Sequence, residues 1–406
     1  MQEKTDPSTL ALLGGSPTFA EPLHVNKPNA APRAAFEAYL DIAWERRWFS
    51  NDGPLLREFE ARLAAYLGVA ECVLTCNGTA ALELTLRALN LTGEVILPSF
   101  TFISTANALV LAGLTPVFCD INAATMNIDC DACRALITEQ TSAVIATHVW
   151  GRPCDTERLQ AICDAAGIAL LYDAAHAFGV EHLGRRIGGF GQAEIFSLHA
   201  TKVLHAFEGG VISTNDASLA ADLRLRRNFG FSAVDRIDMV GINAKMSEAH
   251  AAMGLANLDT LDTTIAANRA CHDTYAEGLA DIAGLRLCRP GPDEVSNYHY
   301  VIAEIDATEF GLNRDDFIDL LCAENILARR YFHPGCHRMT PYLPPEGPPP
   351  TLPVTEALCD RVLVLPAGAA IALKDVASIC GLIRFASRHA ASIALRLAAD
   401  RKQAPS

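Results

Sequence analysis

The chain has 406 residues, which at roughly 150 residues per domain predicts two or three domains with a large buried core. Half of the residues are hydrophobic and 20% are charged, a composition typical of globular rather than disordered proteins. The formal net charge is -14 and no cluster of Lys and Arg stands out, which disfavours a nucleic-acid partner.

Near the start, residues 1–10 lack a basic region followed by an apolar core, so we expect no signal peptide. Beyond residue 70, short apolar runs alternate with helical patterns. The strands expected lie at residues 71–76, 94–97, 116–120, 143–147 and 168–172. The helices expected among them lie at residues 79–90, 101–112 and 157–166. Strands that alternate with helices predict βαβ units and a mostly parallel sheet.

The second half of the chain changes character. Residues 247–280 form one long helical pattern, which we interpret as a bridge to a second domain. A strand at 298–304 and helices at 314–324 and 374–386 predict a smaller α/β domain. The Pro-rich segment 344–353 between them predicts an extended surface loop.

Thirteen cysteines are scattered along the chain, an odd number. Without an export signal, this usage favours reduced, buried thiols and a cytoplasmic location. Cys130 and Cys133 form one CxxC, but no second pair or nearby His set completes a zinc site. We interpret residues 129–136 as the start of a helix and expect no metal. The most apolar stretches, 106–113 and 168–172, are far shorter than a membrane span.

Two segments near the N-terminal strands could hold a phosphorylated aromatic ligand. Gly78 and Thr79 open a helix directly after a strand, where free N–H groups and the helix dipole can bind a phosphate. Thr79 could instead be only an N-cap. Phe102 could stack on a flat heteroaromatic ring, although an aromatic residue at such a junction is more often part of the core.

Two later segments could carry the reaction. Asp173 follows an apolar strand, at the edge of a parallel sheet where ligands bind, and its carboxylate could pair with a protonated pyridine nitrogen. An N-cap or an ordinary salt bridge is the alternative. His176 could donate to a ring hydroxyl or be a core histidine. Lys202 follows a strand-like run and could be a neutral nucleophile with a lowered pKa, or a surface lysine. Ser197, in the same segment, could add a hydroxyl to the phosphate site.

The order of these segments along the chain is more specific than any one of them. With these segments in this order, the chain resembles the DegT/DnrJ/EryC1/StrS sugar aminotransferases, which are fold-type I pyridoxal-phosphate enzymes. The resemblance runs from about Pro28 to Ala386. The segments that carry it are NGTAAL, LPSFTFISTANAL, GLTPVFCDI, YDAAHAFG, HATK, EGGVISTND, GINAKMSEAHAAMGLANL, HPGCHR and VLVLPAG.

The resemblance implies an α/β fold with three parts. It implies an N-terminal arm at residues 1–27 and a large cofactor-binding domain at 28–265. That domain would have a mostly parallel, seven-stranded sheet flanked by helices. A smaller C-terminal α/β domain would occupy residues 266–406.

The resemblance also implies roles for the residues above, with pyridoxal 5'-phosphate as cofactor. Lys202 would bond to the cofactor and later transfer protons, Asp173 would pair with the pyridine nitrogen, and Phe102 would stack on the ring. Gly78, Thr79 and Ser197 would hold the phosphate. Many relatives have Gln where this chain has His176, which can still donate one N–H, although its charge would then depend on pH.

Further positions are implied by resemblance alone. Asn243 would reach the phosphate of the neighbouring subunit's cofactor, so the working unit would be a homodimer with shared active sites. Five residues resemble positions near the substrate: His199, Lys245, Arg330, Tyr331 and His337. Arg330 and His337 could equally be ordinary surface residues.

The function that follows is transamination of a nucleotide-linked keto-6-deoxy sugar with L-glutamate as amino donor. The HATK and EGG segments look more like relatives that aminate the 4-keto carbon of a dTDP-6-deoxyhexose. A 3-keto-sugar or cyclitol aminotransferase shares the same motifs and stays an alternative. A pyridoxamine-dependent dehydratase is disfavoured, because such relatives have His at the position of Lys202. A cofactor-binding protein without catalysis is the remaining alternative.

Overall fold

A computed structural model describes residues 4–291, 294–344 and 346–403. Outside these ranges lie residues 1–3 of the predicted arm, residue 345 of the predicted Pro-rich loop, and residues 292–293, 345 and 404–406 of the predicted C-terminal domain.

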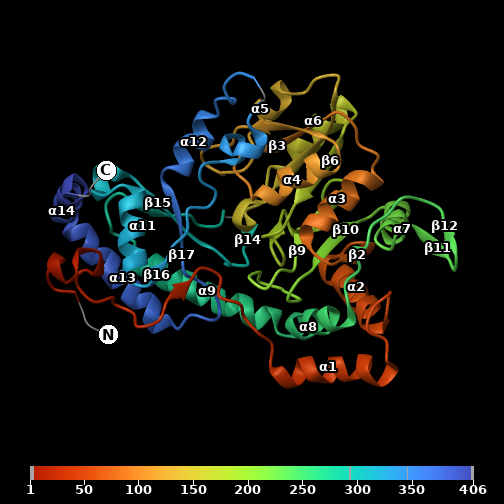
Figure 1. Cartoon of the computed structure of the whole chain (residues 1–406), viewed down its shortest axis with the longest axis horizontal. Coiled ribbons are helices and arrows are strands. Elements are labelled where there is room, and N and C mark those ends of the chain that lie inside the picture. The colour runs from red at the N-terminus through yellow and green to blue at the C-terminus, as the bar shows by residue number, and fades with distance from the viewer. Residues whose placement is uncertain (1–3, 292–293, 345, 404–406) are drawn as a thin grey trace.

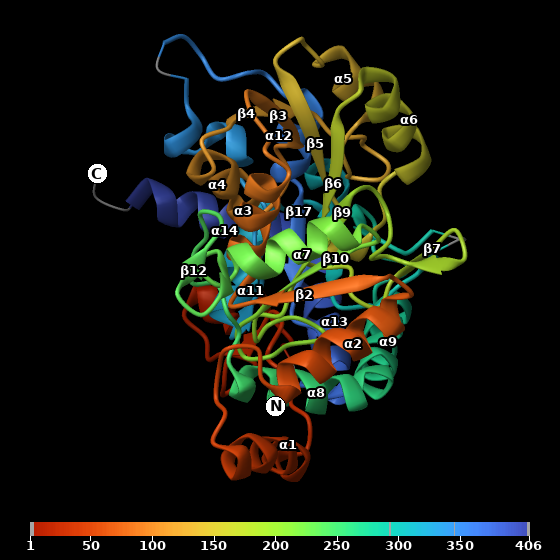
Figure 2. The same cartoon turned by 90° about the vertical axis from the view of Figure 1, so that its right-hand side faces the viewer.

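The centre of the larger part of the molecule is a seven-stranded sheet with the order β2-β10-β9-β6-β5-β3-β4 (Figures 1 and 2). Strand β10 runs antiparallel to both of its neighbours and all other pairs are parallel. The mostly parallel sheet that the sequence predicts is therefore confirmed. Its strands are β2 (Glu71–Thr75), β3 (Glu94–Pro98), β4 (Thr115–Cys119), β5 (Thr141–Thr147), β6 (Ala169–Asp173), β9 (Ala193–Ser197) and β10 (Gly210–Thr214).

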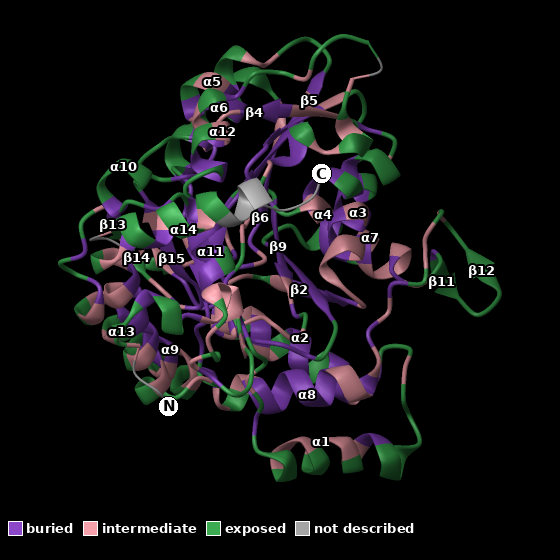
Figure 3. Cartoon of the chain, turned by 60° about the vertical axis from the view of Figure 1, so that its left-hand side comes forward, coloured by how far each residue is buried: buried purple, intermediate pink, exposed green. Residues whose placement is uncertain are grey.

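Helices cover both faces of this sheet. Because side chains alternate along a strand, Leu170 and Tyr172 pack into one apolar cluster and Leu171 into the other. The cluster around Leu171 includes residues of α3 (Gly78–Ala88), α4 (Ile103–Leu111) and α7 (Ala217–Arg226). The opposite cluster includes residues of α2 (Pro54–Leu67), α5 (Cys130–Ala135), α6 (Thr156–Ala166) and α8 (Glu248–Asp259). Figure 3 shows the strands of the sheet and α8 as mostly buried, whereas α5 and α6 carry exposed residues.

Two of the predicted element bounds are wrong. The single helix expected at 247–280 is two helices, α8 and α9 (Leu261–Gly278), which meet at Thr260. The φ of -113° at Thr260 lies outside the helical region, so the helix is interrupted there. The strand expected from 298 begins only at Val301, because Tyr298 has a φ of 50°, which lies outside the extended region. The described part of the predicted loop 344–353 is irregular up to Leu352, and Pro353 begins α12.

The smaller part of the molecule contains a three-stranded antiparallel sheet with the order β13-β15-β17. Its strands are β13 (Leu285–Leu287), β15 (Val301–Ile305) and β17 (Val362–Leu365), and the helices that accompany it are α10 (Ala307–Phe310), α11 (Arg314–Ala323), α12 (Pro353–Cys359), α13 (Leu373–Arg388) and α14 (Ala390–Gln403). The predicted division between residues 265 and 266 falls inside α9 and stays a prediction.

The N-terminal arm is attached to this smaller part. Strand β1 (Leu23–His24) pairs in parallel with β16 (Ile326–Leu327). The buried Glu324 carboxylate accepts hydrogen bonds from the backbone N–H groups of Ala11 and Thr18, both at 2.7 Å.

Helix α1 (Arg33–Arg46) and the hairpin of β11 (Phe231–Ala233) and β12 (Arg236–Ile237) project from the body (Figures 1 and 3). Both expose large apolar side chains, among them Trp44 at 69% and Val234 at 91% exposure. A further three-stranded sheet has the order β14 (Glu294–Val295), β7 (Glu181–His182) and β8 (Arg185–Arg186).

Candidate active site

A cavity of about 330 Å³ opens where several strands of the large sheet end. Asp173 ends β6, Ser197 ends β9, and Gly78 follows β2 by three residues. Parallel strands bring their carboxyl ends to one edge, so residues distant in sequence meet there. Nine of the predicted site residues line this cavity: Gly78, Thr79, Phe102, Asp173, His176, Ser197, His199, Lys202 and Tyr331.

Lys202 is the amine of this cavity, and it is partly buried. Burial disfavours the ammonium form and lowers its pKa to about 8, although Asp173 acts in the opposite direction. The backbone N–H of Lys202 donates to the carbonyl of His199 at 2.8 Å, in the turn after β9. The neutral amine is therefore available close to neutral pH, as nucleophilic attack on an aldehyde requires.

Asp173 is a buried carboxylate in the same cavity, 4% exposed. Its Oδ2 accepts from the Thr105 hydroxyl at 2.6 Å, and its Oδ1 accepts from the Ala175 N–H at 3.0 Å. These two bonds orient the carboxylate. Since it caps no helix and has no ion pair among the described residues, it can still bind a cationic ring nitrogen.

His176 is neutral and its tautomer is determined by its surroundings. The Trp150 N–H donates to His176 Nδ1 at 3.2 Å, which leaves the ring proton on Nε2. Burial, with smaller contributions from Lys202 and His299, holds the pKa of His176 well below its usual value. The change in charge of His176 that the sequence predicts therefore occurs at a lower pH than for a free histidine. Near neutral pH the neutral ring donates a hydrogen bond through Nε2.

The first turn of α3 offers free N–H groups. The N-cap is Asn77, whose Oδ1 accepts from the Ala80 N–H at 2.8 Å, so the alternative of Thr79 as N-cap is wrong. Thr79 instead shares a hydrogen bond with Ser104, 2.6 Å between hydroxyl oxygens. In the described part of the chain no hydrogen bond engages the N–H of Gly78 or Thr79. A Cβ on Gly78 would lie 3.4 Å from the Cβ of Ser197, so the helix start and Ser197 adjoin. This combination fits a phosphate.

Two aromatic residues and one histidine complete the predicted set in the cavity. Phe102 is 54% exposed, so it is not a core residue, and its ring is free to cover a flat ligand. Tyr331 stacks on Phe332 with 5.4 Å between ring centroids. His199 contacts the Thr201 hydroxyl at 2.8 Å through Nδ1 and lies 3.7 Å from Glu208 through Nε2.

Four predicted residues do not line the cavity. Asn243 is exposed and receives a hydrogen bond from Lys245 Nζ at 2.7 Å. Arg330 pairs with Asp315 and Asp319 of α11. His337 is fully buried, with Nδ1 2.6 Å from the Ser99 hydroxyl and Nε2 3.1 Å from Glu356. The roles proposed for these four residues stay predictions.

Sequence reasoning missed several residues that line the cavity, including Val25, Asn26, Glu208, Tyr300 and Phe332. Val25 and Asn26 belong to the predicted arm, and no motif around them indicated a site. Tyr300 lies in the sequence NYHY, where polar aromatic side chains at the start of a strand were a usable signal.

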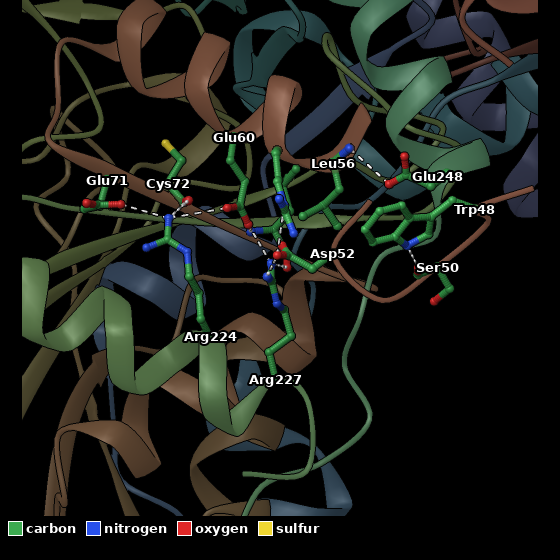
Figure 4. A network of polar contacts seen from close by, with 12 residues as sticks. Trp48, Ser50, Asp52, Leu56, Glu60, Glu71, Cys72, Arg224, Arg227 and Glu248 are labelled. Atoms are coloured by element: carbon green, nitrogen blue, oxygen red, sulfur yellow. Dashed lines mark hydrogen bonds and ion pairs between the residues drawn. The ribbon is translucent and has the colours of Figure 1, made fainter. Parts of the chain in front are cut away.

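A buried ionic network adjoins the end of β2 (Figure 4). Arg227 Nη1 lies 2.5 Å from Glu60 Oε1 and donates to the carbonyl of Leu74, in β2, at 2.8 Å. The backbone carbonyl of Arg227 accepts from Ala244, whose own carbonyl accepts from the Cys76 N–H. This network therefore joins the end of β2 to the segment that holds Asn243.

The CxxC pair lies away from this site. Asp129 caps α5, which begins at Cys130, so the expected helix start is confirmed. Burial raises the pKa of Cys130 to about 11 and that of Cys133 to about 12, which keeps both thiols protonated. None of the helices described has both the length and the apolar composition of a membrane span.

Comparison with known proteins adds to this geometry. Residues 32–384 match the DegT/DnrJ/EryC1/StrS aminotransferase family. A dTDP-4-amino-4,6-dideoxy-D-glucose transaminase of Shigella dysenteriae is 37% identical over 323 residues, 80% of this chain and 88% of the relative. The Escherichia coli protein of the same name is 35% identical over 346 residues, 84% and 92% of the two chains. The crystal structure of DesI with its TDP-sugar product superposes with a TM-score of 0.92 at 46% identity and covers 96% of this chain and 99% of that one.

Proposed function

The chain belongs to the DegT/DnrJ/EryC1/StrS aminotransferase family, and we propose that it transfers the amino group of L-glutamate to the 4-keto carbon of a dTDP-linked 6-deoxyhexose. The named relatives support the sugar and the nucleotide, since two of them are dTDP-4-amino-4,6-dideoxy-D-glucose transaminases. One observation carries the reaction type. A lysine with a lowered pKa, a buried carboxylate and free helix N–H groups share one cavity.

The cofactor of this reaction is pyridoxal 5'-phosphate in our proposal. When bound, it supplies an aldehyde that accepts the amino group and a conjugated ring that withdraws electrons from the reacting carbon. The cavity supports each contact. Gly78, Thr79 and Ser197 would hold the phosphate, and Phe102 would cover one face of the ring. Asp173 would keep the ring nitrogen protonated.

Two residues would handle protons. Lys202 Nζ would take the proton from the α-carbon of glutamate in the first half of the reaction and return one to the sugar carbon in the second half. His176 Nε2–H would donate to the ring oxygen, with Nδ1 already engaged by Trp150. A covalent reaction divided in this way gives ping-pong kinetics.

A homodimer with shared active sites completes the proposal. Asn243 is exposed on its own subunit, and α1 and the β11–β12 hairpin expose Trp44 and Val234. Exposed apolar patches of this kind mark association surfaces. The thirteen free thiols support the cytoplasm as compartment.

Lys202→Ala tests the reaction type. The variant should lose turnover and the visible absorbance of lysine-bound cofactor, whereas Lys374→Ala, at an exposed lysine of α13, should match wild type. Turnover of Lys202→Ala close to wild type would show that the assignment is wrong.

A panel of dTDP-, GDP- and UDP-linked keto sugars, with glutamate as donor, tests the substrate. The 4-amino product of the dTDP sugar should dominate, as identified by mass and NMR. A 3-amino or cyclitol product would support the alternative aminotransferases, and loss of a sugar hydroxyl without amination would indicate a dehydratase. If no amino group passes from glutamate to the bound cofactor, the protein is non-catalytic.

A further inference from the structure

A buried oxygen without a partner lies in the lining of the active-site cavity. Asn26 lines the cavity and is only 6% exposed. Within the ranges that the structure describes, its Oδ1 has no hydrogen-bond partner. An unpaired buried carbonyl oxygen costs free energy, so it indicates a hydrogen-bond partner that comes from outside the chain.

The arm presents Asn26 in a defined conformation. Leu23 and His24 pair with Ile326 and Leu327, which fixes the chain two residues before Asn26. Asn26 itself has a φ of 52°, in the left-handed region that asparagine tolerates better than most residues. The arm therefore does more than cover the smaller part of the molecule, because it brings a polar side chain to the cavity.

Tyr300 lines the same cavity, close enough to Asn26 for the amide to act on the pKa of the Tyr300 hydroxyl. Its ring lies 4.8 Å from the rings of both His176 and His299, measured between centroids. Burial raises the pKa of Tyr300, so its hydroxyl stays protonated. Asn26 Oδ1 is therefore an acceptor without a partner among the described residues, and the protonated Tyr300 hydroxyl supplies a donor in the same cavity lining.

This assignment does not depend on the orientation of the amide. With the carboxamide turned over, an Asn26 N–H would occupy the position of Oδ1 and would be the donor without a partner, and Tyr300 Oη would be the acceptor. In both orientations the pair offers at least one donor beside at least one acceptor.

A hydroxyl is the group that satisfies such a pair, since it both donates and accepts. A carboxylate only accepts and an ammonium only donates, so the charged groups of glutamate match it less well. Tyr331 and Phe332, stacked beside it in the cavity lining, suit the apolar face of a sugar ring. We propose that Asn26 and Tyr300 form a subsite that binds a ring hydroxyl of the sugar, an inference that rests on the function proposed above.

The experiment separates the two halves of the reaction. Asn26→Leu and Tyr300→Phe each remove one polar group and keep the approximate shape. A second Tyr–Asn pair, Tyr342 with Asn107, lies outside the cavity and supplies the matched controls Tyr342→Phe and Asn107→Leu. Each holoenzyme is assayed for the rate of the glutamate half-reaction and for the Kd of the dTDP-linked 4-amino-4,6-dideoxy-D-glucose product by titration calorimetry.

Each cavity variant should raise the Kd of the amino sugar about 3- to 10-fold, as expected for one lost hydrogen bond. The glutamate half-reaction should stay within about twofold of wild type, and both controls should match wild type in both measurements. Thermal unfolding of every variant identifies any loss of fold, and Tyr300→Phe, which keeps the ring, is the variant expected to fold normally.

Two results would overturn the inference alone: wild-type Kd values in both cavity variants, or an equal loss in the glutamate half-reaction. If wild-type protein exchanges with glutamate but binds no dTDP-linked amino sugar, the proposed sugar substrate and this subsite are both wrong.

Discussion

Breaking the buried ion pair of Glu60 and Arg227 should destabilise the protein more than breaking any exposed pair. Both side chains are less than a tenth exposed, and their closest atoms lie 2.5 Å apart (Figure 4). Arg227→Met keeps the length and apolar volume of the side chain but leaves the carboxylate without its nearest cation. The perturbation is therefore chiefly electrostatic.

The magnitude follows from what remains around Glu60. Removal of one partner of a buried pair costs about 3–5 kcal/mol. Arg224 still lies 3.3 Å from Glu60 Oε2, and the Leu74 N–H still donates to Oε1 at 2.9 Å. Because these partners remain, we expect the free energy of unfolding to fall by about 3 kcal/mol, near the lower end of that range.

Urea unfolding at equilibrium measures the loss, with Arg226→Met as the matched control. Arg226 pairs with Asp222 at a more exposed position of α7, so its loss should cost about 1 kcal/mol or less. The double variant Glu60→Gln with Arg227→Met should regain at least half of the loss, because no unpaired charge is then buried. The reasoning is refuted if Arg227→Met is no less stable than Arg226→Met, or if the double variant is no more stable than Arg227→Met.

Three further results are expected. Asp173→Asn should slow the glutamate half-reaction about 100-fold, since an amide cannot hold the ring nitrogen protonated. Thr105→Val removes only the hydroxyl that donates to Asp173 Oδ2, and it should slow the same half-reaction tenfold at most. Single-turnover absorbance measures both rates. In cofactor-free protein, the neutral fraction of Lys202 rises with pH through its pKa of about 8. The rate at which Lys202 bonds to added pyridoxal phosphate should therefore rise with a midpoint near pH 8 and level off above it. A midpoint near 10.5 would contradict the argument that burial lowers the pKa. Gly254→Ala would place a Cβ 2.2 Å from Phe59 Cε1 and should cost about 1–3 kcal/mol, whereas Gly381→Ala on the exposed side of α13 meets nothing and should stabilise by about 0.5–1 kcal/mol, both by thermal denaturation.

Local signals were sufficient for five strands of the central sheet, but not for the antiparallel β10. The alternation of apolar strands and amphipathic helices depends on neighbours in sequence, so it predicted β2 to β6 within one or two residues of their observed bounds. The predicted bridge helix failed at Thr260 and the predicted strand failed at Tyr298, because a single backbone angle ends an element without changing its hydrophobic pattern.

Positions of side chains relative to one another came only from the tertiary structure. Arg330 and His337 lie in a segment that resembles substrate-binding positions, yet α11 carboxylates pair with the first and Ser99 and Glu356 enclose the second. The left-handed turn at Asn26 depends on no motif, and its place in the cavity depends on the pairing of β1 with β16, about 300 residues apart in the chain.

The amino-acid sequence by itself determined the fold class, the order of the reactive residues and the chemistry that they can perform, since these depend on residue type and on spacing along the chain. The tertiary structure decided which of those residues share a cavity, which tautomer His176 adopts and how far burial lowers the pKa of Lys202. These properties depend on distance through space and on exclusion of water, which folding alone establishes.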